Sequence, residues 1–191
     1  MTKTFSESLG NPAPLGLVVF GTTTFYLMTI DMGWSDAGFQ DLVAANAFYY
    51  GGLCQLIVGI AELIKGSSFS FLVFGSYGAF WMGFSQLHFM TLDTTTDMGN
   101  SPDMVGKSMY YLQWTVLTTF FTFVATRKNR GLVLLLGSLA TTFGLLTIST
   151  GTGIVNPSTG TIIKRIAGYV GFATALQAYY MAFAEIINEG T

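Results

Sequence analysis

The sequence predicts an all-α integral membrane protein, a six-transmembrane-helix bundle that forms a single transmembrane domain over residues 1–191. Two observations lead to this prediction. Of the 191 residues, 51% are hydrophobic and only 9% are charged, whereas a soluble domain is about 25% charged. The charged residues also cluster, and the apolar stretches between them are about 20 residues long, the length that a helix needs to cross a hydrocarbon layer of about 30 Å.

Polar segments that contain glycine, proline or several charges separate the apolar stretches. These separators are an acidic segment at 31–41, a turn at 65–68, a polar segment at 93–107, a basic run at 127–130 and a loop at 151–161. Between them, six spans are predicted at about 14–30, 44–64, 69–90, 109–125, 132–150 and 166–187. The first ten residues are polar, and no signal-peptide cleavage site follows the first apolar stretch.

The basic residues predict the orientation, because cytoplasmic loops carry an excess of Lys and Arg. With both termini cytoplasmic, five basic residues lie on the inner side and three on the outer side. The inner ones are Lys3, Lys65, Arg127, Lys128 and Arg130, and the outer ones are Lys107, Lys164 and Arg165. We therefore expect a multi-pass protein of the plasma (inner) membrane with both termini in the cytoplasm.

Several function classes are excluded by the sequence pattern. No nucleophile elbow, phosphate-binding loop, paired catalytic acids or metal-ligand spacing occurs, and no basic segment of the kind that binds nucleic acid is present. The lone cysteine, Cys54, has no partner for a disulfide or a metal and is expected to fill space. We expect no enzyme activity, no cofactor, no metal and no nucleic-acid partner, with the lipid bilayer as the surroundings.

A proline-containing heptapeptide opens the first span. It comprises Asn11, Pro12, Ala13, Pro14, Leu15, Gly16 and Leu17. Asn11 can cap a helix, and both prolines suit a first helical turn, where backbone N–H groups lack helical partners. An anion site at this helix N-terminus is the alternative interpretation, but the two prolines remove donors that such a site would use.

This heptapeptide resembles the signature of the acetate uptake transporter family, the succinate–acetate permeases of bacteria and archaea and their fungal relatives. Three further segments, at 48–62, 76–81 and 167–189, resemble the second, third and last spans of that family. The resemblance covers nearly the whole chain. It implies a six-helix protomer with its own substrate path, assembled into a ring-like homohexamer. It also implies acetate, and in some members succinate, as substrates that cross as anions through a channel or together with a proton.

The resemblance further implies a hydrophobic constriction midway along the path, which maps onto Phe20, Tyr77 and Leu139 in three different spans. An apolar ring excludes water while it admits the methyl end of acetate. Without the family match, ordinary packing would account for all three side chains.

Three polar side chains are candidates for the wall of the path: Thr23, Gln55 and Ser76. Thr23 follows Phe20 by three residues and therefore shares its helix face. Hydroxyl groups in a packed bundle also bond to their own helix, which is the alternative account. A histidine side chain can take up and release a proton, so a proton relay at His88 is an open interpretation. Glu62 is expected to pair with Lys65 three residues on.

No Lys or Arg falls in the middle of a predicted span. A tight carboxylate site generally uses a fixed cation, so we expect weak, fast passage or passage with a proton. Two alternatives remain: a neutral-solute channel for urea or short amides, and a membrane protein that scaffolds or senses partners without transport. The heptapeptide favours the carboxylate transporter.

Overall fold

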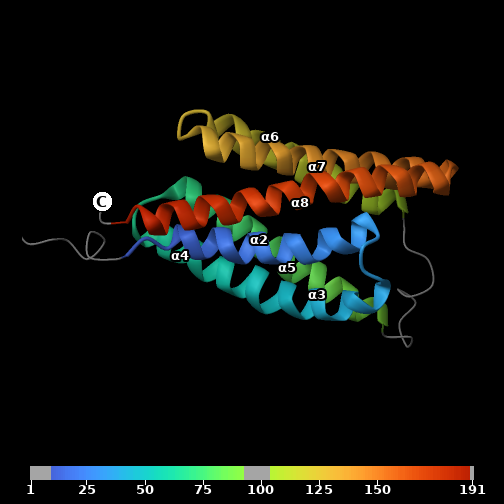
Figure 1. Cartoon of the computed structure of the whole chain (residues 1–191), viewed down its shortest axis with the longest axis horizontal. Coiled ribbons are helices and arrows are strands. Elements are labelled where there is room, and N and C mark those ends of the chain that lie inside the picture. The colour runs from blue at the N-terminus through green and yellow to red at the C-terminus, as the bar shows by residue number, and fades with distance from the viewer. Residues whose placement is uncertain (1–9, 93–103, 190–191) are drawn as a thin grey trace, which may run out of the picture. The chain divides into compact units, whose positions relative to one another are not determined.

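The computed structural model describes residues 10–92 and 104–189, and all regular structure within them is helical (Figure 1). Residues 40–64 form one continuous helical segment. Counted in this way, the described part of the chain contains six long helical segments. The elements in order are α2 (Ala13–Met32), the 3-10 helix η1 (Ala37–Phe39), α3 (Gln40–Asn46), the π-helix η2 (Ala47–Cys54), α4 (Gln55–Ile64), α5 (Ser68–Leu92), α6 (Met104–Ala125), α7 (Arg130–Val155) and α8 (Pro157–Ile187).

Among the described helices, four are both long enough and apolar enough to cross a membrane. They are Ala13–Met32, Gln40–Ile64, Arg130–Val155 and Pro157–Ile187. Helices α5 and α6 have the required length, with 25 and 22 residues. Their serine, threonine, glycine and tyrosine residues lower their mean hydropathy, which is typical of helices that pack against protein in a bundle.

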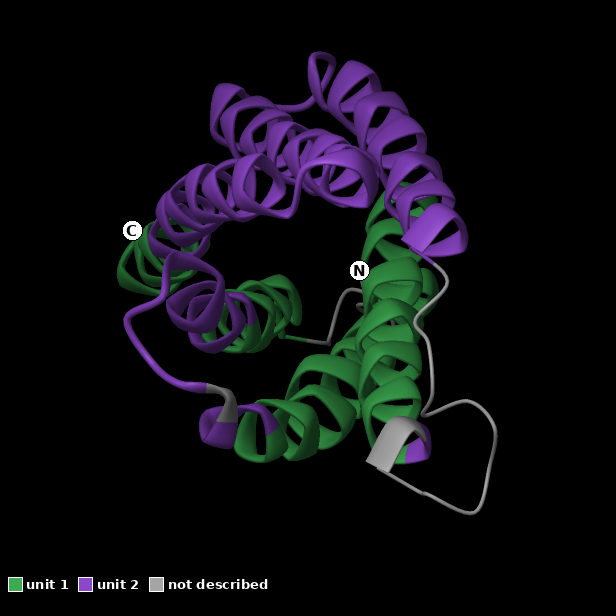
Figure 2. Cartoon of the chain, turned by 90° about the vertical axis from the view of Figure 1, so that its right-hand side faces the viewer, with its two compact units in different colours: residues 1–23, 41–89, 178–191 green, residues 24–40, 90–177 purple. Residues whose placement is uncertain are grey.

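The chain divides into two compact units, which are coloured separately in Figure 2. Unit 1 comprises residues 1–23, 41–89 and 178–191, and unit 2 comprises residues 24–40 and 90–177. Each unit therefore joins segments that are distant in sequence, and α2 and α8 contribute to both. The predicted single transmembrane domain stays a prediction.

Glycine residues bring the helices of unit 1 close together. A Cβ atom at Gly16 of α2 would lie 2.5 Å from Cε1 of Phe74 on α5. A Cβ atom at Gly59 of α4 would lie 3.0 Å from the backbone nitrogen of Gly75, and one at Gly78 would lie 2.9 Å from the nitrogen of Leu56. Small residues thus set the approach of α2 and α4 to α5, as they do at helix contacts in membranes.

Hydroxyl groups and aromatic rings join the helices of unit 2. Ser108 Oγ of α6 donates to the Thr147 carbonyl of α7 at 3.0 Å, and Thr174 Oγ1 of α8 donates to Ser138 Oγ of α7 at 2.8 Å. The second half of α2 meets α8 through Phe25 and Phe172, whose ring centroids lie 4.7 Å apart. The hydrogen bonds of these hydroxyls satisfy polar groups that lipid would leave unpaired.

The predicted loop at 151–161 is wrong. Helix α7 continues to Val155 and α8 begins at Pro157, which leaves Asn156 as the whole connection. The Asn156 backbone N–H donates to the Thr152 carbonyl at 2.8 Å, and its side-chain Oδ1 accepts from the Thr159 N–H at 3.0 Å. One residue therefore closes one helix and caps the next, and Pro157 occupies the first helical position, where proline is favoured.

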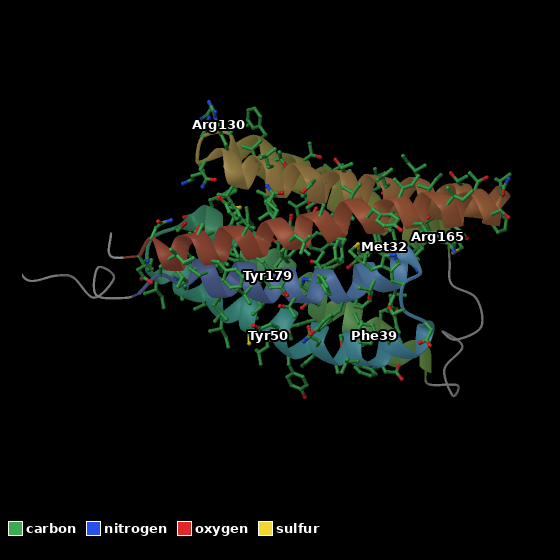
Figure 3. The ribbon with its side chains drawn as sticks, viewed as in Figure 1. Met32, Phe39, Tyr50, Arg130, Arg165 and Tyr179 are labelled. Atoms are coloured by element: carbon green, nitrogen blue, oxygen red, sulfur yellow. The ribbon has the colours of Figure 1, made fainter. Side chains whose placement is uncertain are left out.

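The remaining connections show how helices extend beyond the predicted spans. The turn at 65–68 is confirmed, with Gly66 in the left-handed region at a φ of 86°. Lys107, Lys164 and Arg165, expected between spans, lie on α6 and α8 instead, and Figure 3 labels Arg165 on α8. Residues 1–9 and 93–103, which include the polar N-terminus and most of the separator at 93–107, lie outside the described residues.

Candidate transport path

Two of the three predicted constriction residues meet in unit 1. The rings of Phe20 on α2 and Tyr77 on α5 have centroids 5.8 Å apart at an interplanar angle of 42°. Their exposed fractions are 5% and 2%. The absence of a side chain at Gly16, one turn before Phe20, lets α2 approach α5 at this level.

The third residue, Leu139, lies on α7 in unit 2. It is also buried, with 4% of its surface exposed. Its place in one constriction with the aromatic pair stays a prediction.

Thr23 is fully buried and its hydroxyl is used inside the protein. Its Oγ1 lies 2.9 Å from the Val19 carbonyl and 3.0 Å from Oδ1 of Asn46 on α3. A Cβ atom at Gly51 of η2 would lie 2.5 Å from the same oxygen. Thr23 therefore ties α2 to the segment around η2, a packing role that the sequence offered as the alternative.

Asn46 is a polar site residue that the sequence interpretation missed. It lies between alanines in an apolar stretch, and that isolated amide is the signal that marks it. Asn46 is the last residue before the π-helix η2, and Gln55 is the first residue after it. Two amides thus bracket a π-helical segment, an irregularity that often occurs at functional sites.

The other predicted polar residues differ in their surroundings. Gln55 is 1% exposed, and its Oε1 has no hydrogen-bond partner in the described part of the chain. Ser76 on α5 is half-buried. Two further buried groups on α5, Trp81 Nε1 and Ser85 Oγ, also lack a partner among the described residues. They were missed because a tryptophan and a serine in an apolar span ordinarily signal packing.

The heptapeptide joins the start of α2 to the end of α8 within unit 1. Asn11 Oδ1 accepts from the Ala13 N–H at 3.2 Å, which confirms the predicted cap. The Asn11 Nδ2 donates to Oε2 of Glu185 at 3.1 Å. Further along the same two helices, Tyr179 Oη donates to Thr22 Oγ1 at 2.8 Å; Tyr179 is labelled in Figure 3. A carboxylate of the chain itself thus sits at this helix start.

The charged side chains that the sequence singled out have other partners than expected. Within residues 10–92 and 104–189, Glu62 makes no ion pair with Lys65, so that prediction is wrong. Lys65 follows the last residue of α4, and its Nζ reaches past the helix end to donate to the Gly10 carbonyl at 3.2 Å. His88 Nε2 lies 2.8 Å from Oδ1 of Asp41, so its role as a relay stays open.

One buried carboxylate has a basic partner in unit 2. Asp31, near the end of α2, has a side chain that is 7% exposed, and its Oδ1 lies 3.0 Å from Nζ of Lys164 on α8. Within the described residues, no group of three or more His, Cys, Asp or Glu side chains could hold a metal ion.

The surface of the six long helical segments is rich in apolar side chains: α2 exposes one large one, Leu15, and each of the other segments exposes several. Such a surface suits lipid or the faces of neighbouring protomers and is unsuited to water. Together with the long apolar helices, it indicates a multi-pass helical membrane protein.

A profile of the GPR1/FUN34/yaaH family matches residues 1–191. The chain therefore belongs to this family, which confirms the acetate-transporter family expected from the heptapeptide.

Relatives across this family support the same class. The succinate-acetate/proton symporter SatP of Escherichia coli (strain K12) is 33% identical over 184 residues, which cover 96% of this chain and 92% of SatP. The ammonia transport outward protein 2 of Saccharomyces cerevisiae is 35% identical over 184 residues, which cover 94% of this chain and 62% of that protein. A solved structure of the bacterial acetate channel SatP matches with a TM-score of 0.85 and 33% identity, over 95% of this chain and 94% of the other. The fold is therefore that of a six-helix membrane transport protein, and the chain is not an enzyme.

Proposed function

We propose that this protein carries acetate and other small monocarboxylates across the plasma membrane along a path through each protomer. The observation that carries the proposal is the match in sequence and fold, over nearly the full chain, to a structure described as an acetate channel. The buried contact between Phe20 and Tyr77 supports it, because these residues fall where the family resemblance puts a constriction.

We propose that Phe20, Tyr77 and Leu139 together form this constriction. A ring of apolar side chains disfavours water and admits the methyl end of acetate, and the Tyr77 hydroxyl can donate a hydrogen bond to the passing carboxylate. Among the three polar candidates, Gln55 suits the path best because its buried Oε1 is unpaired in the described residues and can accept a hydrogen bond from the protonated form of the acid. Thr23 and Ser76 are proposed to complete the wall, although the Thr23 hydroxyl also bonds within the protein.

Passage is proposed to depend on neutral groups. With a pKa near that of Glu, about 4.3, roughly one acetate in several hundred is protonated at pH 7. The protein therefore either conducts the anion as a channel or moves it with a proton. The exposed apolar side chains fit a ring-like homohexamer in lipid, with both termini cytoplasmic. Succinate is proposed as a second substrate, on the name of the bacterial relative.

Uptake of labelled acetate into proteoliposomes, with and without an imposed proton gradient, tests the proposal. Saturable uptake above that of protein-free liposomes is expected. Dependence on the gradient indicates a symporter, and independence indicates a channel. Uptake equal to that of protein-free liposomes under both conditions contradicts the proposal.

A neutral-solute channel is the second candidate, and it is favoured by the name of the yeast relative, which refers to ammonia. Such a channel would pass urea or ammonia at a rate that saturating acetate does not reduce. The same proteoliposomes, assayed for swelling in urea with and without acetate, separate the two functions.

A further inference from the structure

We propose that Trp81 and Ser85 of α5 form a binding station for one small carboxylate, held by the indole N–H and the serine hydroxyl. This inference rests on the proposed function and deepens it, because it names donors that neither the family constriction nor the sequence interpretation includes. Both residues belong to unit 1.

The starting observation is a pair of buried polar atoms without partners. Trp81 is 3% exposed and Ser85 is 0% exposed. Neither Trp81 Nε1 nor Ser85 Oγ has a hydrogen-bond partner in the described part of the chain. Buried donors are almost always paired, with protein, ordered water or a ligand, because an unpaired one loses its hydration without compensation. We therefore expect each of these two donors to have an acceptor bound to it.

The two donors continue the line of the constriction. Tyr77, Trp81 and Ser85 follow one another at intervals of four residues, so they lie on one face of α5, one above the other. Each step is about 6 Å along the helix axis. Tyr77 contacts Phe20 at the start of this line. A solute that passes the aromatic pair along this face of α5 therefore meets the indole and then the hydroxyl.

The indole is held in place by its neighbours. The ring of Trp81 makes edge contacts with Phe80 and Phe84, with centroids 5.1 Å and 5.9 Å apart. A fixed ring presents its N–H in one direction, which suits a ligand that arrives repeatedly at the same point. Tryptophan nitrogen only donates, so its partner has to be an acceptor.

A carboxylate matches this pair in chemistry. It offers two acceptor oxygens, one for the indole N–H and one for the hydroxyl. Two neutral donors bind an anion more weakly than an arginine fork does, and weak binding suits a station from which the solute must leave again. Ordered water is the competing occupant, since it too can accept from both groups.

Indole NMR separates acetate from water as the occupant. The chain has three tryptophans, so selective 15N-tryptophan labelling of the assembled protein in detergent gives three indole signals, which Trp→Phe variants assign. In the titration, sodium acetate replaces sodium chloride so that the ionic strength stays constant. We expect the Trp81 signal to move saturably. The signal of Trp34, whose side chain is exposed, is expected to stay in place. Urea at the same concentrations is expected to leave the Trp81 signal unmoved.

Ser85→Ala tests the second donor through the same signal. Loss of one hydrogen bond should weaken the apparent acetate affinity about two- to tenfold. Ser70→Ala is the matched control on the same helix, because Ser70 Oγ already accepts a hydrogen bond from Ser67 Oγ at 2.8 Å. The acetate affinity of this variant should equal that of the unaltered protein. Should Trp81→Phe fail to fold, the Ser85→Ala titration still decides.

Acetate flux into proteoliposomes made from the same preparation separates a failure of the binding station from a failure of the transport function. Normal flux with an unmoved Trp81 signal, or with Ser85→Ala binding acetate like the unaltered protein, overturns the station and leaves the transport proposal intact. Absence of both flux and shift overturns both proposals. A saturable Trp81 shift without flux supports the station and contradicts transport.

Discussion

Replacing Gly16 with alanine would place a methyl group against the ring of Phe74. The added Cβ would lie 2.5 Å, 2.8 Å and 2.9 Å from three ring carbons, closer than Cβ atoms approach neighbours in real structures. Phe74 is 8% exposed, so its ring has little free space into which it can move. Overpacking of this kind costs about 1–3 kcal/mol, and the higher helix propensity of alanine offsets up to about 1 kcal/mol of it.

Gly83→Ala provides the matched control on α5, because nothing lies within 4 Å of its added Cβ. The difference in unfolding free energy between the two variants isolates the steric cost, which we expect to be about 1–3 kcal/mol. Reversible unfolding in mixed micelles, followed by circular dichroism, measures it. Phe74→Leu should cost less in the Gly16→Ala background than in the unaltered protein, since the two sites are in contact. A Gly16→Ala protein as stable as Gly83→Ala would refute the steric reasoning.

Four further predictions concern charge, the constriction and orientation. Lys164→Gln should destabilise the protein by about 2–3 kcal/mol in the same assay, and more than Asp31→Asn, because it strands a buried carboxylate while Lys164 itself is half exposed. Tyr77→Glu should abolish acetate flux at pH 7, because a buried carboxylate repels the anion, and Tyr77→Phe should retain it. Leu139→Ala should admit bulkier acids such as lactate in the uptake assay. A cysteine placed at Asn129, with the natural cysteine replaced, should react with an impermeant reagent only from the cytoplasmic side.

Each of these predictions has an outcome that contradicts it. Equal losses of unfolding free energy in Lys164→Gln and Asp31→Asn would mean that water reaches the Asp31 carboxylate. Undiminished flux in folded Tyr77→Glu would mean that the anion passes elsewhere, and unchanged selectivity of Leu139→Ala would remove Leu139 from the constriction. Labelling at position 129 from outside intact cells would reverse the topology.

The sequence predicted the helices well where hydrocarbon sets their length, and poorly where they end. Six apolar stretches correspond to the six long helical segments because a bilayer demands about 20 apolar residues from each. Hydropathy does not indicate where a helix ends once the helix extends beyond the hydrocarbon layer. Helix α8 begins at Pro157, ahead of Lys164 and Arg165, whereas the span predicted from hydropathy begins at 166.

Only those residues of the candidate site that lie in motifs shared with the family could be predicted from the sequence. Phe20 and Tyr77 were matched through local motifs, and the structure brings their rings together. The bond from Thr23 to Asn46 joins residues 23 positions apart and depends on how α3 and η2 pack on α2, which no local pattern encodes. The predicted pairing of Glu62 with Lys65 failed for a related reason: Lys65 lies just past the end of α4 and contacts the Gly10 carbonyl, which is distant in sequence.

The connection between α7 and α8 is short, and the helices that it joins are long. With 26 and 31 residues, they extend about 39 Å and about 46 Å at 1.5 Å per residue, against a hydrocarbon thickness of about 30 Å. Even at an average tilt of about 20°, both exceed that thickness, so part of each helix stands in the headgroups or in water. A reporter or an antibody fragment attached beside Asn156 would thus be held by two continuous helices. Its orientation would report on how unit 2 is tilted in the bilayer.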